Sequence, residues 1–470
     1  MKYNHIHPYA TLEYLSRFAF LFIIPVLQQL ILIPHGMSEF LGKLGFNILI
    51  CIGIIIYCII EYRNFKYLNS SNFLSIQTGV LINRRSYILY DKIHFLTITK
   101  KIIPTIFGAT KLLIGMPSKG VNNNLHLTLL SKALVEKIKY KDLNFQQNTT
   151  KMWKIALMSA TWSNPATGLL LFSPFVNRIG IILGQEIAER VYSTVDISWQ
   201  LIAWGVPPLT ATITYILMLG WIISLLHRFV NYYGFSTIYT KDKIITKRGF
   251  ISTTTDIIDK PNINAIFIKQ TLFMRLFKLY SASVSIAGTK KYGIDSNMII
   301  AASTFSELYS QLSKMFPNCM NYKNEIRPNK EAFKSFIILP ISAIIISPTL
   351  IFLLSYFNIN REISYIIVIF IESILVLWLI TRIIAFKISK FSITDKTVIS
   401  TGYRGLNLIT CIIFIDKLQN INITQNALQR FSNRCNIQLF FFSNKRVYNT
   451  VHHLNIDNTY NQINHLYNNN

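Results

Sequence analysis

Residues 242–268 read DKIITKRGFISTTTDIIDKPNINAIFI, and this stretch decides the fold. Asp242 and Gly249 bracket a short β-rich run, and an alternating apolar run follows the glycine. The pair Asp259-Lys260 then separates that run from a third one, which begins at Ile263. Turn-forming Asp and Gly between runs of period two are typical of antiparallel hairpins. The stretch therefore predicts a small antiparallel β-sheet.

The same pattern occurs three times along the chain. Its fixed points are the turn residues Asn72, Asp242 and Asp395, the glycines Gly79, Gly249 and Gly402 seven residues later, and the pairs Asp91-Lys92, Asp259-Lys260 and Asp416-Lys417. A helical apolar pattern closes each segment, near 130–140, 304–316 and 456–467, and Thr304 with Glu307 matches a capping box. Such a repeat indicates three copies of one unit. We expect the glycines in equivalent hairpin turns and each helix over the open end of a small β-barrel.

Six apolar stretches lie between the soluble segments, each near the ~20 residues that cross a bilayer. They are residues 14–34, 41–60, 154–176, 199–226, 333–357 and 364–386, and they form three hairpins. Of the 470 residues 51% are hydrophobic and 14% are charged, against roughly 25% charged in soluble proteins. The sequence predicts a polytopic α-helical membrane protein with hairpins in 1–60, 151–227 and 331–386, and α+β domains at 61–150, 228–330 and 387–470.

The charge distribution predicts the orientation. Lys and Arg outnumber Asp and Glu by 15 to 4 in residues 61–154, by 15 to 7 in 227–332 and by 10 to 3 in 382–470. These three segments carry the whole formal net charge of +26. Positive segments stay on the cytoplasmic side of a membrane. We therefore expect a multi-pass protein of the plasma membrane with both termini and all three domains in the cytoplasm.

Motifs of enzymes and of nucleic-acid binding are absent from the sequence. It contains no P-loop, HExxH, GxSxG or EF-hand loop, and its five cysteines form no CxxC pair. The pairs His5 with His7 and His452 with His453 have no cysteine or carboxylate cluster beside them, whereas a zinc site needs about four convergent ligands. We expect no enzyme activity, no cofactor, no metal and no nucleic-acid partner.

The chain resembles the second class of bacterial pleckstrin-homology (PH)-like membrane proteins, in particular its YdbT-like family. The resemblance is carried by Ile6-His7-Pro8-Tyr9-Ala10 at the N-terminus, by the paired spans, and by the block from Gly79 to Asp91-Lys92 with its two further copies. Ile106-Phe107-Gly108-Ala109 resembles that family's strand entry, where the other copies read Leu276-Phe277-Lys278-Leu279 and Arg430-Phe431-Ser432-Asn433. The resemblance implies a PH-like barrel for each segment, association with a smaller PH-like membrane protein, and a role in envelope maintenance or resistance to membrane-active compounds.

Two sets of residues are candidates for function. The first comprises basic residues near the hairpins, which would contact anionic membrane lipid: Arg84, Arg85, Lys243, Lys247 and Arg248. Alternatively, these residues form only a solvated, positive-inside surface. The second is Glu372, which lies in the middle of the sixth span, where a carboxylate must face protein or water. It acts either as a proton or substrate relay or as a packing group bonded to Ser342, Ser347 or Ser355.

Two functions from different classes follow. The first is a non-enzymatic scaffold whose cytoplasmic domains bind partner proteins and anionic lipid at the membrane. The second is a six-span transporter or export component that uses Glu372 and the helix break at Pro207-Pro208. Proline is also ordinary in membrane helices, so the break by itself favours packing over transport.

Overall fold

The computed structural model describes most of the chain. The described residues are 3–18, 37–70, 72–80, 82–116, 125–131, 146–163, 208–286, 297–317, 319–320, 325–356, 361–441 and 448–468. They form two compact units. The first contains residues 1–145 together with 251–259 and 288–290, and the second contains 146–250, 260–287 and 291–470. The predicted helix near 130–140 lies mostly outside the described residues; Leu130, which belongs to its pattern, lies in a strand.

Three repeats share one order of elements: strands a, b and c, a 3₁₀ turn, strand d, a short helix, and strands e and f. In the first repeat these are β2 (Lys66–Asn69), β3 (Phe73–Thr78), β4 (Arg84–Leu89), η1 (Tyr90–Lys92), β5 (Phe95–Lys100), α4 (Ile102–Ile106), β6 (Ala109–Gly115) and β7 (Leu125–Ser131). In the second they are β9 (Ser236–Tyr239), β10 (Lys243–Arg248), β11 (Thr253–Asp259), η2 (Lys260–Asn262), β12 (Ile263–Thr271), α10 (Leu272–Leu276), β13 (Leu279–Ile286) and β14 (Asn297–Thr304). In the third they are β15 (Lys390–Ile393), β16 (Thr397–Arg404), β17 (Asn407–Phe414), η4 (Ile415–Lys417), β18 (Leu418–Thr424), α14 (Ala427–Phe431), β19 (Arg434–Phe441) and β20 (Tyr448–Asn455).

The predicted repeat of antiparallel β-domains is therefore confirmed. Asp91, Asp259 and Asp416 lie at the same 3₁₀ turn between strands c and d. The predicted closing helices of the second and third repeats are α11 (Phe305–Met315), which begins with the Thr304–Glu307 capping box, and α15 (Ile456–Asn468).

Gly402 differs from the predicted turn position. Gly79 and Gly249 have positive φ values of 121° and 104° just after strand b, whereas Gly402 lies inside β16, opposite Ile409. The third hairpin instead turns at Gly405, where φ is 61°. A Cβ atom on Gly402 would lie 2.6 Å from the carbonyl oxygen of Thr450 in β20. Glycine is required there by the close approach of a second strand, not by a turn.

The core of the third repeat lies between two sheets rather than inside one closed barrel. One sheet contains β15, β16 and β17, the other contains β18, β19 and β20, and the strands within each pair antiparallel. Val398, Ile409 and Cys411 of the first sheet pack against Ile437 and Leu439 of the second, and all five are buried. The Asn449 side chain joins the two sheets by donating a 2.7 Å hydrogen bond to Ser400 Oγ.

The sheets also join neighbouring repeats. In the first unit β5 of repeat one pairs antiparallel with β11, which belongs to repeat two by sequence. In the second unit β12 of repeat two pairs in the same way with β17 of repeat three. Strand d of one repeat thus pairs with strand c of the next, so the soluble segments share strands instead of folding as separate barrels.

Two residues after the end of each short helix lies a residue with left-handed backbone. These residues are Gly108 (φ 76°), Lys278 (φ 52°) and Asn433 (φ 48°). Glycine and asparagine adopt this conformation readily, and lysine adopts it at a cost. The three copies, which differ in sequence here, therefore have the same backbone before strand e.

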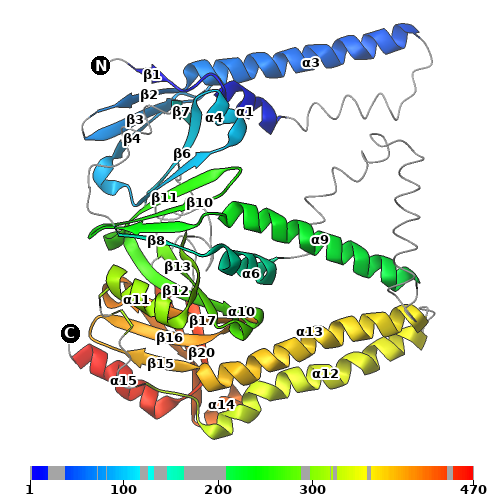
Figure 1. The fold of residues 1–470 in the computed structure, drawn as a ribbon, viewed down its shortest axis with the longest axis vertical. Helices are drawn as coiled ribbons and strands as arrows, with labels where there is room; N and C mark the ends of the chain where they lie inside the picture. Colours follow the sequence, from blue (N-terminus) through cyan, green and yellow to red (C-terminus); the bar gives the residue numbers. More distant parts are fainter. Residues whose placement is uncertain are drawn as a thin grey trace. The chain divides into compact units, whose positions relative to one another are not determined.

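Long helices precede the first strand of each repeat. They are α3 (Met37–Asn64), α9 (Pro208–Tyr232) and α13 (Arg361–Ile388), and α13 packs against α12 (Phe333–Tyr356) (Figure 1). Among the described residues, one stretch, Lys330–Thr349, is long and apolar enough to cross a membrane by the criteria of length and composition, and only 17% of its apolar window is buried. The predicted spans 14–34, 154–176, 199–226 and 333–357 lie partly outside the described residues.

Candidate membrane-contact surface

Each repeat has a proximal end, where the preceding long helix enters the sheet, and an opposite, distal end. In repeat three α13 ends at Ile388 and strand a begins at Lys390, so the a–b turn is distal and the b–c turn at Gly405 is proximal. The first two repeats are alike, because Asn64 at the end of α3 donates a side-chain hydrogen bond to the carbonyl oxygen of Gly79 (3.1 Å), and Gly249 N bonds Tyr233 O beside the end of α9 (2.9 Å).

The short helices lie at the proximal ends. The 3₁₀ turn is distal, because Lys260 N bonds the carbonyl oxygen of Asp242 in the a–b turn (2.8 Å), and Ile415 N bonds that of Lys396 (3.1 Å). Strand d starts at this turn and runs back to the proximal end, where α4, α10 or α14 follows. In the second unit, α10 packs against α6 (Met152–Trp162).

Every short helix exposes two large apolar side chains three residues apart. The exposed fractions are 60% and 75% for Ile103 and Ile106, 53% and 76% for Phe273 and Leu276, and 83% and 91% for Leu428 and Phe431. Side chains at this spacing lie on one face of a helix. Adjacent exposed apolar side chains at the same place in every repeat are candidates for contact with a partner or a membrane.

Exposed basic side chains flank these apolar pairs. Lys101 precedes α4, Lys278 follows α10, and Arg430 lies within α14. Apolar side chains with adjacent cations are the combination that binds the interface of an anionic bilayer, because the former enter the acyl boundary and the latter face the phosphates.

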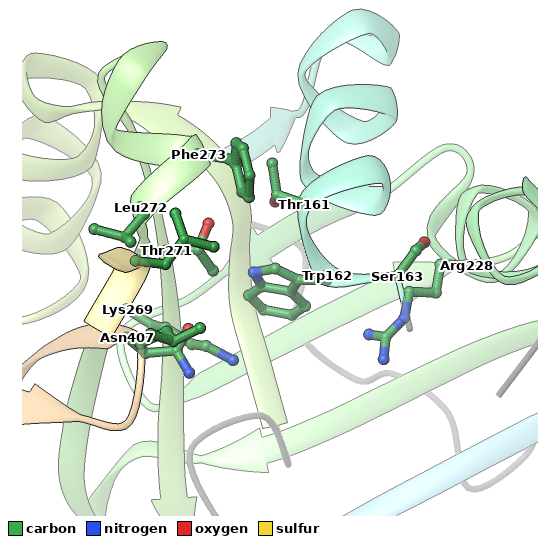
Figure 2. A pocket seen from close by; sticks show the side chains of 11 residues that line it. Thr161, Trp162, Ser163, Arg228, Lys269, Thr271, Leu272, Phe273 and Asn407 are labelled. Carbon is green, nitrogen blue, oxygen red and sulfur yellow. The ribbon is translucent and has the colours of Figure 1, made fainter. Parts of the chain in front are cut away.

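A cavity of about 470 Å³ lies at the proximal end of the second repeat, between α6, α9, α10 and α13 (Figure 2). Lys269 and Arg228 line it from opposite sides of Trp162, and the Lys269 Nζ lies 4.2 Å from the centre of the indole ring. The Trp162 Nε1 is buried and has no hydrogen-bond partner in the described part of the chain. Two cations and a spare indole donor suit an acidic group such as a phosphate.

The basic residues expected to contact lipid lie in different places. Arg84 and Arg85 are exposed near the proximal b–c turn, and so is Lys247, which is opposite Ser236. Lys243 is exposed at the distal a–b turn. The four residues of β9, about 13 Å of strand, separate this turn from the end of α9. That separation exceeds the Debye length of ~8 Å at physiological salt.

Arg248 is buried, although the sequence predicts that it lies on the lipid-contacting surface. Only 8% of Arg248 is exposed, and its guanidinium lies 5.4 Å from the centre of the Tyr232 ring, at the end of α9. The prediction that it reaches lipid together with Lys243 and Lys247 is wrong, because alternate residues of a strand point to opposite faces and Arg248 points inward.

Glu372 has one of its expected serine partners. The Ser347 hydroxyl of α12 donates a hydrogen bond to Glu372 Oε1 of α13. This contact confirms one of the three serine partners expected from the sequence, and it ties the two helices of the hairpin together. The predicted helix break consists of Pro207 and Pro208. Pro208 is the first residue of α9, a position that suits proline, and Pro207 lies outside the described residues.

His452 and His453 belong to an aromatic cluster. The His453 ring packs edge-on against Phe336 (5.1 Å between centres) and His452 lies 5.1 Å from Tyr403. Burial, together with the positive charge of nearby Arg382, lowers the pKa of both imidazoles to about 4. Within the described part of the chain, no cluster of three or more His, Cys, Asp or Glu residues has the arrangement of a metal site.

Each antiparallel domain follows a long helix and has the same six strands and one short helix in the same order. This arrangement defines a protein with repeated PH-like domains. The chain matches the model of the bacterial PH domain over residues 19–142 and 186–316, and it belongs to this family. The third repeat lies beyond these ranges but has the same order of elements.

One curated relative is the UPF0699 transmembrane protein YdbT of Bacillus subtilis (strain 168). It is 22% identical over 287 residues, which cover 57% of this chain and 58% of the relative. The match thus spans less than two thirds of the relative's length. No solved structure matches the chain.

Proposed function

We propose that this chain is a non-enzymatic membrane scaffold with six spans, cytoplasmic termini and three cytoplasmic PH-like domains that contact anionic lipid and partner proteins. The observation that carries the lipid contact is the apolar pair of α4, α10 and α14, exposed at the proximal end of every repeat beside a cation. A smaller PH-like membrane protein remains the proposed partner, and envelope maintenance or resistance to membrane-active compounds the proposed role.

The proposal assigns the lipid contact to proximal residues. Leu428 and Phe431 would enter the interface while Arg430 faces the phosphates, and the cavity beside Trp162 would hold one acidic headgroup. Burying two such side chains in an apolar environment contributes about 3–6 kcal/mol, at 1.5–3 kcal/mol each. Lys243, at the distal end, would contribute little to this contact.

The experiment uses the full chain in liposomes that contain anionic lipid. A spin label at Leu428→Cys is compared with one at Asp395→Cys, an exposed residue of the distal a–b turn in the same repeat. Collision with oxygen, which concentrates in the bilayer, is measured against collision with a water-soluble nickel chelate. We expect the label at 428 to favour oxygen and the label at 395 to favour nickel.

The lipid contact fails if the label at 428 is as accessible to nickel as the label at 395. Liposomes of neutral lipid separate the two contributions. If the cations matter, the oxygen preference at 428 is weaker there, and high salt weakens it in anionic liposomes, because the Debye length falls to about 3 Å at 1 M.

A further inference from the structure

The two joints between repeats have the same register. In the first, Thr97 of β5 lies opposite Asp256 of β11, and in the second, Ala265 of β12 lies opposite Ile413 of β17. In both, the sixth residue after the aspartate of one repeat faces the third residue before the aspartate of the next. The Thr97 hydroxyl also donates a 2.7 Å hydrogen bond to Asp256 across the first joint. A shared register indicates one joint geometry that is used twice.

The series of repeats leaves one half of this joint unpaired at each end. Strand c of the first repeat, β4, is the last strand of the sheet β1–β2–β3–β4, in which β1 is Asn4–His5. Strand d of the third repeat, β18, is the first strand of the sheet β18–β19–β20. Neither has a second partner strand among the described residues.

Burial distinguishes the paired strands from these two edges. Eight of the nine residues of β12 are buried, but none of the seven residues of β18 is. In β4 one residue of six is buried, against five of eight in its counterpart β17. Exposed strand edges pair with other strands unless charges, prolines or bulges prevent it. Residues 420–424 of β18 have none of these protections.

The geometry points to head-to-tail assembly, in which β18 of one copy of this chain pairs antiparallel with β4 of a second copy. The register of the internal joints puts Asn422 opposite Ile88, Ile421 opposite Leu89, and Ile423 opposite Tyr87. Leu89 and Tyr87 are 52% and 64% exposed in the single chain, and the new joint would cover them with isoleucines. β18 carries no charge, so it adds no repulsion to Arg84 and Arg85 of β4.

A second copy is the occupant because one chain carries both complementary edges, one at each end of its repeats. Such an interface is heterologous, and it continues from copy to copy until a ring closes or a filament forms. The inference goes beyond the proposed lipid contact and does not depend on it, because it concerns strand edges rather than proximal helices.

Disulfide trapping between two full-length variants tests the assembly. The internal register puts Thr424 opposite Ser86, and both are exposed. One preparation carries Ser86→Cys and the other Thr424→Cys, both with Cys51→Ser to remove a partly exposed native thiol. After mixing in detergent and mild oxidation, we expect a disulfide-linked dimer in the mixture only, and neither variant alone should form it.

The matched control replaces Thr424→Cys with Gln419→Cys, which is exposed on the same strand. It lies five residues out of register, about 17 Å from the position opposite Ser86, beyond the ~7 Å Cα separation that a disulfide bridges. Equal crosslinking of both pairs would reflect random collision and overturn the assignment.

Mass measurements on the unmodified chain give a second readout. We expect the wild-type chain to have masses that are multiples of the single-chain mass. The Tyr87→Lys variant should have the single-chain mass, because the charged lysine would face the apolar side chain of Ile423 and weaken the joint. Tyr309→Lys, an exposed tyrosine of α11, should leave the multiples unchanged. The proposal is overturned if the wild-type chain has only the single-chain mass and the mixture of the Ser86→Cys and Thr424→Cys variants forms no disulfide-linked dimer. Capture of a different protein by the Thr424→Cys variant in native membranes would also overturn it. If the Ser86→Cys and Thr424→Cys variants crosslink but the spin label at 428 shows no preference for oxygen, the proposed lipid contact is wrong and the proposed assembly stands.

Discussion

The surroundings of His452 and His453 in the aromatic cluster determine the pKa values of both imidazoles. Arg382 lies in the same cluster, with its guanidinium 5.6 Å from the centre of the Phe336 ring and its Nε bonded to Phe336 O (3.0 Å). Arg434 adds a second positive charge near His453. Burial and these cations oppose protonation, so both imidazoles are neutral in the folded protein near pH 7.

The pH dependence of stability follows from the lowered pKa values. The unfolded chain binds protons near pH 6.5, whereas the folded chain does so only near pH 4. Stability is therefore full above pH 6.5 and is lost as the pH falls toward 4. We expect the thermal midpoint in detergent to decrease between pH 7 and pH 5, above the range in which carboxylates titrate.

Replacing His452→Phe keeps a ring beside Tyr403 and should flatten about half of this decrease. His227→Asn, a change at an exposed histidine of α9, serves as the control and should leave the wild-type slope. A slope that is the same in wild type and His452→Phe would show that these imidazoles do not control the acid sensitivity.

At the scale of elements, one ion pair connects a helix of the second hairpin to the closing helix of the second repeat. Lys154 of α6, whose side chain is 6% exposed, bonds Glu307 of α11. Glu307 Oε2 also accepts a hydrogen bond from Thr304 N (3.1 Å) at the start of α11. Burial opposes ionisation of Glu307, but the bonds from Lys154 and Thr304 outweigh it and hold the pKa of this carboxyl below its usual range.

Removing the charge of Glu307 should therefore destabilise the fold. In Glu307→Gln the amide oxygen still accepts from Thr304 N, but the buried ammonium of Lys154 loses its counter-charge, at a cost of about 1–3 kcal/mol. Thermal unfolding in detergent measures this. Glu331→Gln is the matched control, because Glu331 is 85% exposed and its pair with Arg434 should contribute less than about 1 kcal/mol. Equal effects of the two changes would contradict this account.

At the scale of the whole molecule, the net charge predicts the proposed topology. All of the +26 lies in residues 61–154, 227–332 and 382–470, which contain the three domains and the adjoining ends of the predicted spans. In intact cells a membrane-impermeant thiol reagent should label Asn360→Cys, in the predicted third connector, and should not label Arg85→Cys or Asp395→Cys before the cells are opened. Labelling of either domain position from outside would overturn the orientation.

The sequence alone determined the class of this protein, because its signals are local. Asp or Asn followed seven residues later by Gly, and then by an Asp-Lys pair, predicts three equivalent antiparallel domains, and Thr304 with Glu307 predicts the start of α11, since turns and caps depend on residues a few positions apart. A serine contact for Glu372 also followed from a sequence rule, because a carboxylate among apolar residues needs a polar partner.

The tertiary structure alone decided which strands pair and which side chains remain exposed. Pairing of strand d with strand c of the next repeat joins residues such as Thr97 and Asp256, which are far apart in the chain, and no local pattern encodes that choice. The same holds for Gly402, which is needed because β20 approaches β16, and for Arg248, which is basic in sequence but buried against Tyr232. Burial and strand pairing are properties of the packed chain, so they could be assigned only once distant segments had been placed together.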